Sequence, residues 1–449
     1  MLPVLMQNVI TNFVSLLDNV MIGQVGTEPM SGVAIANQLF FVFNLCIFGG
    51  LAGAGIYTAQ FCGKGDNKGI CHTVRMKIYL AIFITVAGLV ILFTLGTPLI
   101  NSFLHEGNEG LSLTATFDYA MDYMKIMMIQ MPLFALIQVY DSTLREAGET
   151  VIPMVSSIAA VVVNLIGNYI LIFGKLGAPA LGVVGAAIAT VIARVVELGV
   201  LVVYSHTHTK RFPFFADVYK SPKVAAVIVK GIVVKGAMLM LNELLWSSGM
   251  TILNQCYSLR GLEVVSAVNI SSTVGNLFLC VLFSSGSTVN IMVGQLLGAG
   301  KLDEAYSTAR KLRIMAVIFC IIAGGALALC ATPIASIYNT TDTVKQLAVY
   351  FMFVVGAQMP FSAFTNASFF TIRSGGKVLL TFAFDVSATW GGYVVLAFCL
   401  TRFTDLPIVP IYILVNCVEV LKCIVGYFLV RSKKWIVNLV SDDKVGIVE

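Results

Sequence analysis

The sequence predicts an all-α, polytopic membrane protein in which twelve transmembrane helices form two repeat-related six-helix bundles. Of its 449 residues, 58% are hydrophobic and only 11% are charged, whereas a soluble domain carries about 25% charged residues. The apolar residues gather in segments long enough to cross a bilayer, which takes about 20 residues of helix. A β-barrel would show weaker alternation in shorter segments, so helices are expected.

Twelve apolar segments account for the predicted helices. They cover residues 2–25, 31–61, 76–104, 117–141, 151–174, 181–205, 224–257, 264–296, 312–338, 344–372, 378–401 and 407–431. Basic residues concentrate in every second connection, as at Lys64, Arg75 and Arg310, and are sparse in the others. Because basic loops stay on the cytoplasmic side, both termini are expected in the cytoplasm of an inner-membrane protein. The dispersed charge argues against nucleic acid as a partner.

The second half of the chain repeats the first. A shift of 235 residues lays 54–75 over 289–310, and a shift of 228 lays 130–132 over 358–360. The first shift pairs Gln60 with Gln295, Gly63 with Gly298, Thr73 with Thr308 and Arg75 with Arg310. Six helices per half make the repeat parallel. We expect two domains, 1–212 and 213–449, divided within the polar connection 205–223.

A duplication of this kind has two interpretations. It can be kept for helix packing alone, or it can provide two bundles that rock about a central cavity, as in alternating-access transporters. The second interpretation is favoured because polar residues within the predicted spans are arranged to line a cavity.

The first span carries a polar face that ends in a carboxylate. At 100° per residue, this face comprises Asn8, Thr11, Asn12, Ser15, Asp18 and Asn19. A charged side chain at the bilayer centre costs about 2.5–3.5 kcal/mol on insertion scales and usually marks an ion or substrate path. Asp18 is therefore predicted to be functional, with Asn12 and Ser15 as substrate-binding residues, although polar contacts between helices are the alternative.

Two other spans contain candidate coupling residues. Asn164 and Asn168 are four residues apart on one helix face, where their oxygens suit a hard cation such as Na⁺ but equally suit helix packing. Glu243 lies beside Asn242, with Trp246 one turn later. A carboxyl group in an apolar environment is a natural proton carrier, so Glu243 is predicted to couple to protons and Trp246 to line the substrate site.

The remaining charges within spans are interpreted as structural. Arg194 with Glu197 and Glu419 with Lys422 are three residues apart, and Asp141 precedes Arg145 by one turn, so each helix can neutralise its own charges. Asp385 is placed within reach of Lys377 or water, with its role open.

Enzyme motifs such as HExxH, GxxxxGK[ST] and GxSxG are absent from the sequence. The four histidines fall in predicted connections or at their edges. The sequence therefore predicts transport driven by an ion gradient, not an enzyme.

Several longer segments are similar to one transporter family. The spacing P-x14-D-N-V-M-I-G from Pro3, the segments LREAGET (144–150) and NELLW (242–246), and residues 164–190 resemble the multidrug and toxic compound extrusion (MATE) transporters. The resemblance covers essentially the whole chain. It implies a V-shaped pair of six-helix bundles that exports cationic, amphipathic drugs or toxic metabolites in exchange for Na⁺ or H⁺, without another cofactor.

The resemblance also assigns roles to residues. It implies that Asp18 couples to the cation with Asn164 as its partner, that Thr190 assists near this site, and that Glu243 is a coupling glutamate of one branch of the family. Asn168 replaces the aspartate of many relatives, and Ser362 stands where that branch often has an aspartate, which leaves Ser362 as a candidate substrate-binding residue. The amphipathic leader usual in the family is missing, so we expect the recorded start to be incomplete.

These inferences combine in one expected mechanism. A cation binding at Asp18 weakens the attraction for a cationic drug, and the drug weakens cation binding equally. We expect a functional monomer in contact with membrane lipid. The rival transport function is a lipid-linked oligosaccharide flippase, which would need an arginine cluster for pyrophosphate, whereas the spans offer only Arg194 at mid-span. A membrane-embedded enzyme would need an intramembrane His or Cys–His constellation, which the sequence lacks.

Overall fold

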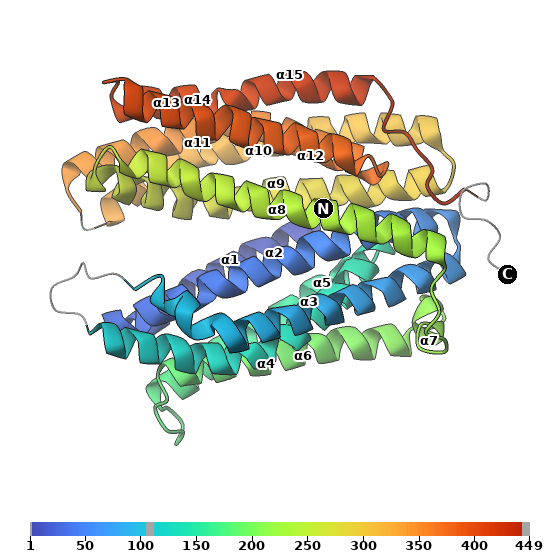
Figure 1. The fold of residues 1–449 in the computed structure, drawn as a ribbon, viewed down its shortest axis with the longest axis horizontal. Helices are drawn as coiled ribbons and strands as arrows, with labels where there is room; N and C mark the ends of the chain where they lie inside the picture. The colour runs from blue at the N-terminus through green and yellow to red at the C-terminus, as the bar shows by residue number, and fades with distance from the viewer. Residues whose placement is uncertain (1, 105–111, 339, 442–449) are drawn as a thin grey trace. The chain divides into compact units, whose positions relative to one another are not determined.

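The computed structural model describes residues 2–104, 112–338 and 340–441, with the side chains of residues 13–16, 19, 20 and 262 left outside the described set. The regular structure of these residues is helical throughout (Figure 1). The first half contains α1 (Leu2–Gly23), α2 (Thr27–Lys64), α3 (Asn67–Asn101), α4 (Leu113–Glu146), α5 (Val151–Phe173), α6 (Val183–Thr207) and α7 (Phe214–Asp217). The second half contains α8 (Ala226–Ser258), α9 (Leu262–Gly298), α10 (Leu302–Ile337), α11 (Asp342–Ser374), α12 (Val378–Val386), the π-helix η1 (Ser387–Val394), α13 (Val395–Phe403), α14 (Ile408–Asn416) and α15 (Val418–Arg431).

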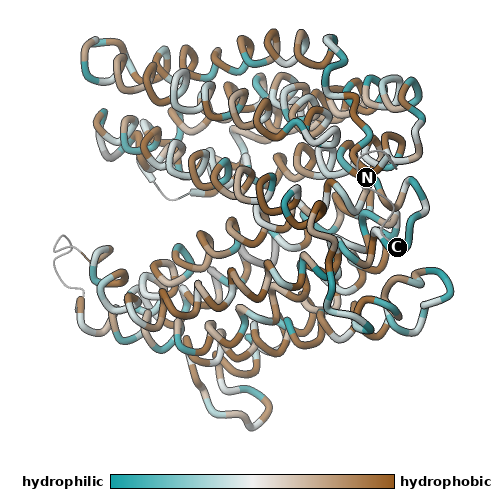
Figure 2. The backbone as a smooth tube through the Cα atoms, turned by 45° about the vertical axis from the view of Figure 1, so that its right-hand side comes forward, coloured by the Kyte–Doolittle hydropathy of each residue, from teal (hydrophilic) through white to brown (hydrophobic). Residues whose placement is uncertain are grey.

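The predicted all-α membrane fold is confirmed. Each of the twelve apolar segments coincides with one helix or with a run of consecutive helices, α12–η1–α13 for the eleventh and α14–α15 for the twelfth. Within the described residues, ten such stretches are long and apolar enough to cross a membrane, and hydrophobic residues dominate along the helices in Figure 2. The helices α1 and α8, which carry Asp18 and Glu243, are not among the ten.

Two helices begin well before their predicted spans. Helix α3 starts at Asn67 and helix α10 at Leu302, whereas hydropathy placed the starts of the corresponding third and ninth spans at 76 and 312. The added turns carry charged residues, which an apolar scan excludes but which a helix tolerates once it leaves the hydrocarbon. Helical geometry therefore continues past the predicted membrane boundary.

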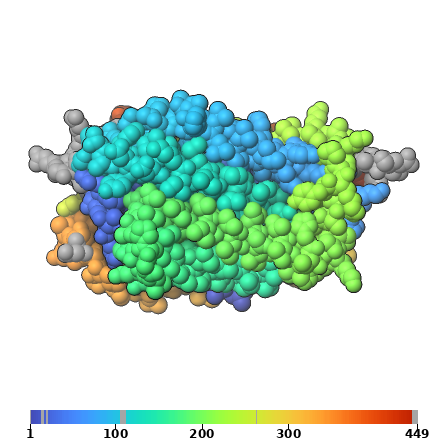
Figure 3. All heavy atoms as spheres, turned by 90° about the horizontal axis from the view of Figure 1, so that it is seen from below, coloured from blue at the N-terminus to red at the C-terminus, as the bar shows by residue number. Residues whose placement is uncertain are grey.

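The described chain divides into two compact units. The first unit comprises residues 2–58 and 67–236, and the second comprises residues 59–66 and 237–449. Helices α2 and α8 each contribute to both units. Side chains of the first unit, coloured from blue to green, form most of the face seen in Figure 3. The domain boundary predicted between 212 and 213 stays a prediction.

Small residues bring the backbones of α5 and α6 close together in the first unit. A Cβ added at Gly167 would lie 2.9 Å from the Ala189 Cβ, and one added at Gly185 would lie 2.5 Å from the Leu171 carbonyl oxygen. Small residues allow this close packing between membrane helices. The contact holds the polar face of α5 against Thr190 on α6.

In the second unit, repeat-related residues meet each other reciprocally. A Cβ on Gly63 would lie 1.8 Å from the Gln295 carbonyl oxygen, and a Cβ on Gly298 would lie 1.8 Å from the Gln60 carbonyl oxygen. The repeat alignment pairs these same glutamines and glycines with one another. The last turn of α2 thus crosses the end of α9 at a distance that only glycine permits.

Candidate functional site

The centre of the candidate site in the first unit is Asp18 on α1. Asn168 of α5 donates a hydrogen bond from Nδ2 to Asp18 Oδ1 at 2.7 Å. The sequence predicted both residues separately, and the packing of α1 against α5 places them in direct contact. The helical stripe and the Asn pair are therefore parts of one site.

Asn164 faces the same carboxylate one turn earlier on α5. With its amide nitrogen toward α1, Asn164 donates to Asp18 Oδ1 at 2.9 Å and to Oδ2 at 3.1 Å. In the opposite amide orientation, its oxygen would face the two Asp18 oxygens with no hydrogen between them. An ionised carboxylate therefore favours the donor orientation, because oxygen atoms at this separation repel one another unless a proton or a cation lies between them.

Two further oxygen atoms belong to the site. Thr190 Oγ1 lies 3.2 Å from the side chain of Asn164, in agreement with the predicted proximity of these two residues. Asn168 Oδ1 is buried and has no hydrogen-bond partner among the described residues. Carboxylate, amide and hydroxyl oxygens are the donors that a hard cation takes, so the set of atoms suits Na⁺ as well as a proton.

The charged neighbours of Asp18 are already engaged. Arg194 acts on Asp18 electrostatically, but its Nη1 is bonded to Glu197 Oε2 at 2.6 Å. Tyr123, which lies near Asp18, donates to Asn37 Oδ1 at 3.3 Å. Among the described residues Asp18 therefore has no direct ion pair, and Arg194 acts on its charge only at a distance.

A chain of buried polar contacts anchors the start of α1. Gln7 donates to Ser157 Oγ at 2.6 Å, and Arg145 Nη2 donates to Gln7 Oε1 at 2.8 Å. Ser157 in turn donates to Glu197 Oε1 at 2.8 Å. The chain links α1 to α4, α5 and α6, and so fixes the helix that carries Asp18.

The two ion pairs predicted at the ends of this series of polar contacts are confirmed. Arg194 pairs with Glu197, and Arg145 Nε lies 2.9 Å from Asp141 Oδ2. Gln7 was not singled out from the sequence, because a lone glutamine in an apolar helix gives no signal of its partners.

The rest of the predicted polar face on α1 is more exposed. Asn12 is exposed and donates from Nδ2 to the Asn8 carbonyl oxygen at 3.0 Å. The predicted substrate-binding side chain of Ser15 lies outside the described set. The substrate-binding roles of both residues stay predictions.

In the second unit, the neighbour of Glu243 makes the polar contact. Asn242 donates to Asp385 Oδ2 at 3.1 Å, and Lys422 Nζ lies 2.7 Å from Asp385 Oδ1. Asp385, whose role the sequence left open, is therefore held by α8 and α15.

The predicted pair between Glu419 and Lys422 is wrong. Glu419 accepts hydrogen bonds from Thr365 and Tyr393, while Lys422 turns to Asp385. Spacing along one helix shows only partners within that helix, and here the partners come from α11, η1 and α12. The result is a buried polar cluster in the second unit, formed by Asn242, Thr365, Asp385, Tyr393, Glu419 and Lys422.

Glu243 itself stands apart from this cluster. Among the described residues it forms no hydrogen bond or ion pair, although Arg373 and Asp385 act on it electrostatically. Trp246 and Ser362 are both half-buried on α8 and α11. The structure does not join these predicted residues into one site.

Comparison with known proteins shows the family of the chain. The MatE family model matches residues 3–170 and 238–399, one segment in each half. The chain belongs to the MATE family. Its members are transporters, and this member is a multi-pass membrane protein.

Similar curated proteins cover nearly the whole of this MATE sequence. The probable multidrug resistance protein NorM of Thermotoga maritima is 24% identical over 435 residues, which are 97% of this chain and 91% of NorM. The probable multidrug resistance protein YoeA of Bacillus subtilis is 24% identical over 460 residues, covering 98% and 95%.

Solved structures share the fold. A crystal structure of MATE in the straight conformation matches with a TM-score of 0.86 at 18% identity, over 96% of this chain and 94% of that chain. An outward-facing multidrug resistance MATE family transporter of the MOP superfamily gives a TM-score of 0.85 at 17% identity, over 96% and 93%. The helical plan predicted from the sequence is therefore that of the family.

Proposed function

We propose that this MATE family member is a secondary active multidrug exporter, which expels cationic, amphipathic compounds in exchange for Na⁺ or H⁺. Asp18 is the coupling carboxylate, and Asn164, Asn168 and Thr190 complete its cation site. The observation that carries the proposal is the contact of two asparagine amides of α5 with the Asp18 carboxylate of α1. The names of the curated relatives support multidrug efflux as the type of transport.

The two amides let the site accept a cation with little rearrangement. Asn164 and Asn168 donate to Asp18 when its carboxyl group is ionised. When Na⁺ or a proton binds, rotation of the Asn164 amide presents its oxygen, and Asn168 Oδ1 is already free of hydrogen bonds within the described structure. The site therefore exchanges N–H donors for oxygen donors as its charge is neutralised.

Neutralisation of Asp18 provides the link to drug release. An ionised Asp18 attracts a cationic drug, and cation binding removes that attraction, so the inward ion gradient drives the drug outward. Linkage requires the drug to weaken cation binding by the same factor. Glu243 is a second proton-coupling candidate because it is partly buried and unpaired in the described part of the second unit.

Ethidium efflux from proteoliposomes tests this function. Wild type, Asp18→Asn and the exposed control Asp118→Asn are compared under an imposed sodium gradient and, separately, a pH gradient. Wild type and the control should export ethidium under one of the gradients, and Asp18→Asn under neither. Equal export by Asp18→Asn and wild type would remove Asp18 from coupling and make Glu243→Gln the next variant to test.

The flippase alternative receives no support from the mid-span arginine. Arg194 is committed to Glu197, so it cannot also neutralise a pyrophosphate group without losing that pair. Export of a small cationic substrate remains the better-supported function.

A further inference from the structure

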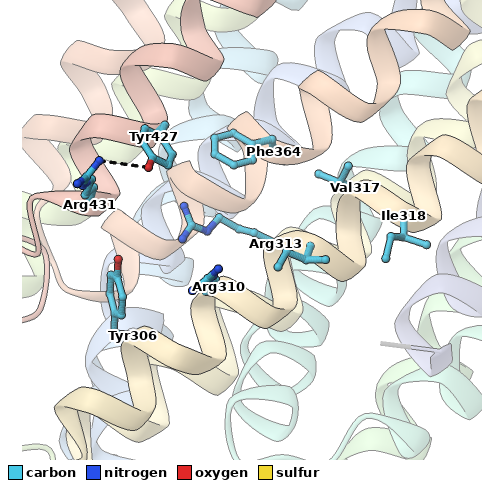
Figure 4. A pocket seen from close by; sticks show the side chains of 9 residues that line it. Tyr306, Arg310, Arg313, Val317, Ile318, Phe364, Tyr427 and Arg431 are labelled. Carbon is cyan, nitrogen blue, oxygen red and sulfur yellow. Dashed lines mark hydrogen bonds between the residues drawn. The ribbon is translucent and has the colours of Figure 1, made fainter.

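A cavity of about 490 Å³ opens between α10, α11 and α15 in the second unit (Figure 4). Its lining changes character from one end to the other. Tyr306, Arg310, Arg313, Tyr427 and Arg431 form the polar end, and Ile314, Val317, Ile318 and Phe364 form the apolar end. None of these residues takes part in the coupling site proposed for the first unit.

The three guanidinium groups of the cavity have no acidic partner within the described residues. No ion pair involves any of them, and the ionisable groups that act on Arg313 are Tyr306, Arg310 and Tyr427. Arg313 is only 8% exposed. A buried cation without a carboxylate is costly, so the cavity is electrostatically complementary to an anion.

Two of the three arginines lie against aromatic rings, and Arg313 also donates from Nε to the Ala309 carbonyl oxygen at 3.3 Å. The Arg313 guanidinium lies 5.5 Å from the centre of the Phe364 ring, and Arg431 donates to the Tyr427 hydroxyl at 3.4 Å. Lys433 lies over the ring of Tyr306 at 4.8 Å and adds positive charge at the same end. Arginine is well suited to bind phosphate oxygens because its donors form a planar fork.

The sequence of α10 places this polar end beside the hydrocarbon. Arg310 and Arg313 come directly before residues 314–337, which contain no charged residue. At about 1.5 Å per residue, that run is roughly 36 Å long and spans the bilayer core of about 30 Å. Ile314 and Ile318 are each 51% exposed, so the apolar end of the cavity is open to acyl chains.

The first repeat shows how the equivalent position is covered by protein. Arg75 is the repeat partner of Arg310, and it donates to the carbonyl oxygens of Val218 at 2.7 Å and Asp217 at 2.8 Å. One turn later, Tyr79 donates to the Pro222 carbonyl oxygen at 2.7 Å. The connection after α6 thus supplies backbone carbonyl oxygens to Arg75. Among the described residues, no backbone carbonyl oxygen accepts a hydrogen bond from Arg310.

We infer that this cavity is a binding site for an anionic phospholipid. Its phosphate group bonds to Arg310, Arg313 and Arg431, and one acyl chain lies along Ile314 and Ile318. The shared chemistry of a phosphate would also admit free inorganic phosphate, but the exposed isoleucines add an apolar surface that only a lipid uses. Basic pockets between membrane helices at the cytoplasmic side bind lipid headgroups of this class.

Lipid binding to the purified, detergent-solubilised full chain tests the site. Native mass spectrometry measures retention of phosphatidylglycerol by wild type, by Arg310→Gln with Arg431→Gln, and by the matched control Lys311→Gln. Lys311 is exposed, adjacent to Arg310 and outside the cavity lining. Thermal unfolding of each variant without lipid shows whether it is folded, and Arg313 is left unchanged because it is buried.

The expected loss of affinity is about five-fold for each arginine removed, from roughly 1 kcal/mol per basic residue near an anionic surface. The double variant should therefore bind phosphatidylglycerol about 30-fold more weakly, with wild-type binding by Lys311→Gln. Phosphatidylcholine should bind weakly to all three. Equal phosphatidylglycerol binding by the folded double variant would overturn the site, and full displacement of the lipid by millimolar inorganic phosphate would assign it to free phosphate instead.

Discussion

Asn168 donates a hydrogen bond to Asp18 at 2.7 Å, so an amide occupies the place at which a second carboxylate would share the proposed cation site. One negative charge therefore serves the site, with oxygen and N–H groups around it. Cation affinity should therefore depend strongly on the charge at residue 168.

Asn168→Asp should tighten cation binding. Two carboxylates at hydrogen-bond distance repel each other, and a bound proton or Na⁺ relieves that repulsion. We expect cation affinity to rise at least about ten-fold and export to slow because the cation leaves less readily. Isothermal titration of the purified protein with Na⁺ and with acid measures the change, with Asn168→Ala, which loses a donor without gaining charge, as the control.

Lys422→Met should destabilise the second unit. It leaves Asp385 as an unpaired charge close to Glu419, and loss of one partner of a buried ion pair costs about 3–5 kcal/mol. The thermal unfolding midpoint in detergent should fall markedly, and the double variant with Asp385→Asn should recover part of the loss. Lys125→Met, which breaks an exposed pair, should cost about 1 kcal/mol or less. If Lys422→Met and Lys125→Met are equally mild, the pair contributes nothing.

Gly298→Ala should be strongly destabilising, because its new Cβ would lie 1.8 Å from the Gln60 carbonyl oxygen. Overpacking typically costs about 1–3 kcal/mol, and here the obstructing atom is backbone. Gly325→Ala, with no atom within 4 Å of the added Cβ, serves as the helical control. Comparison of their unfolding midpoints checks the prediction, and similar midpoints would contradict the close crossing.

Much of the fold was predictable because hydropathy, the basic connections and the repeat are all patterns along the sequence. The twelve segments follow from apolar length alone. Gly63 and Gly298 were recognised as repeat partners, but their contacts with Gln295 and Gln60 required the packing of the helices. A linear pattern contains no information on which face of one helix meets another.

The same limit explains the results at the sites. Asp18, Asn164, Asn168 and Thr190 were each predicted, and the structure brings them together. Asp385 and Lys422 lie 37 residues apart, so helical spacing paired Lys422 with Glu419 and could not connect it with Asp385. Lys77, at the start of the predicted span 76–104, is fully buried and pairs with Glu146 of α4 at 2.6 Å, a partner that spacing along one helix does not indicate.

The central claim is that a cation and a cationic drug compete through Asp18. Equilibrium binding of ethidium to the purified protein, measured by fluorescence at several Na⁺ concentrations and pH values, tests it most directly. Ethidium should bind more weakly to wild type as the coupling cation increases, and binding to Asp18→Asn should be weak and independent of both cations. Ethidium binding to wild type that is unchanged by Na⁺ and by pH would contradict the proposed coupling.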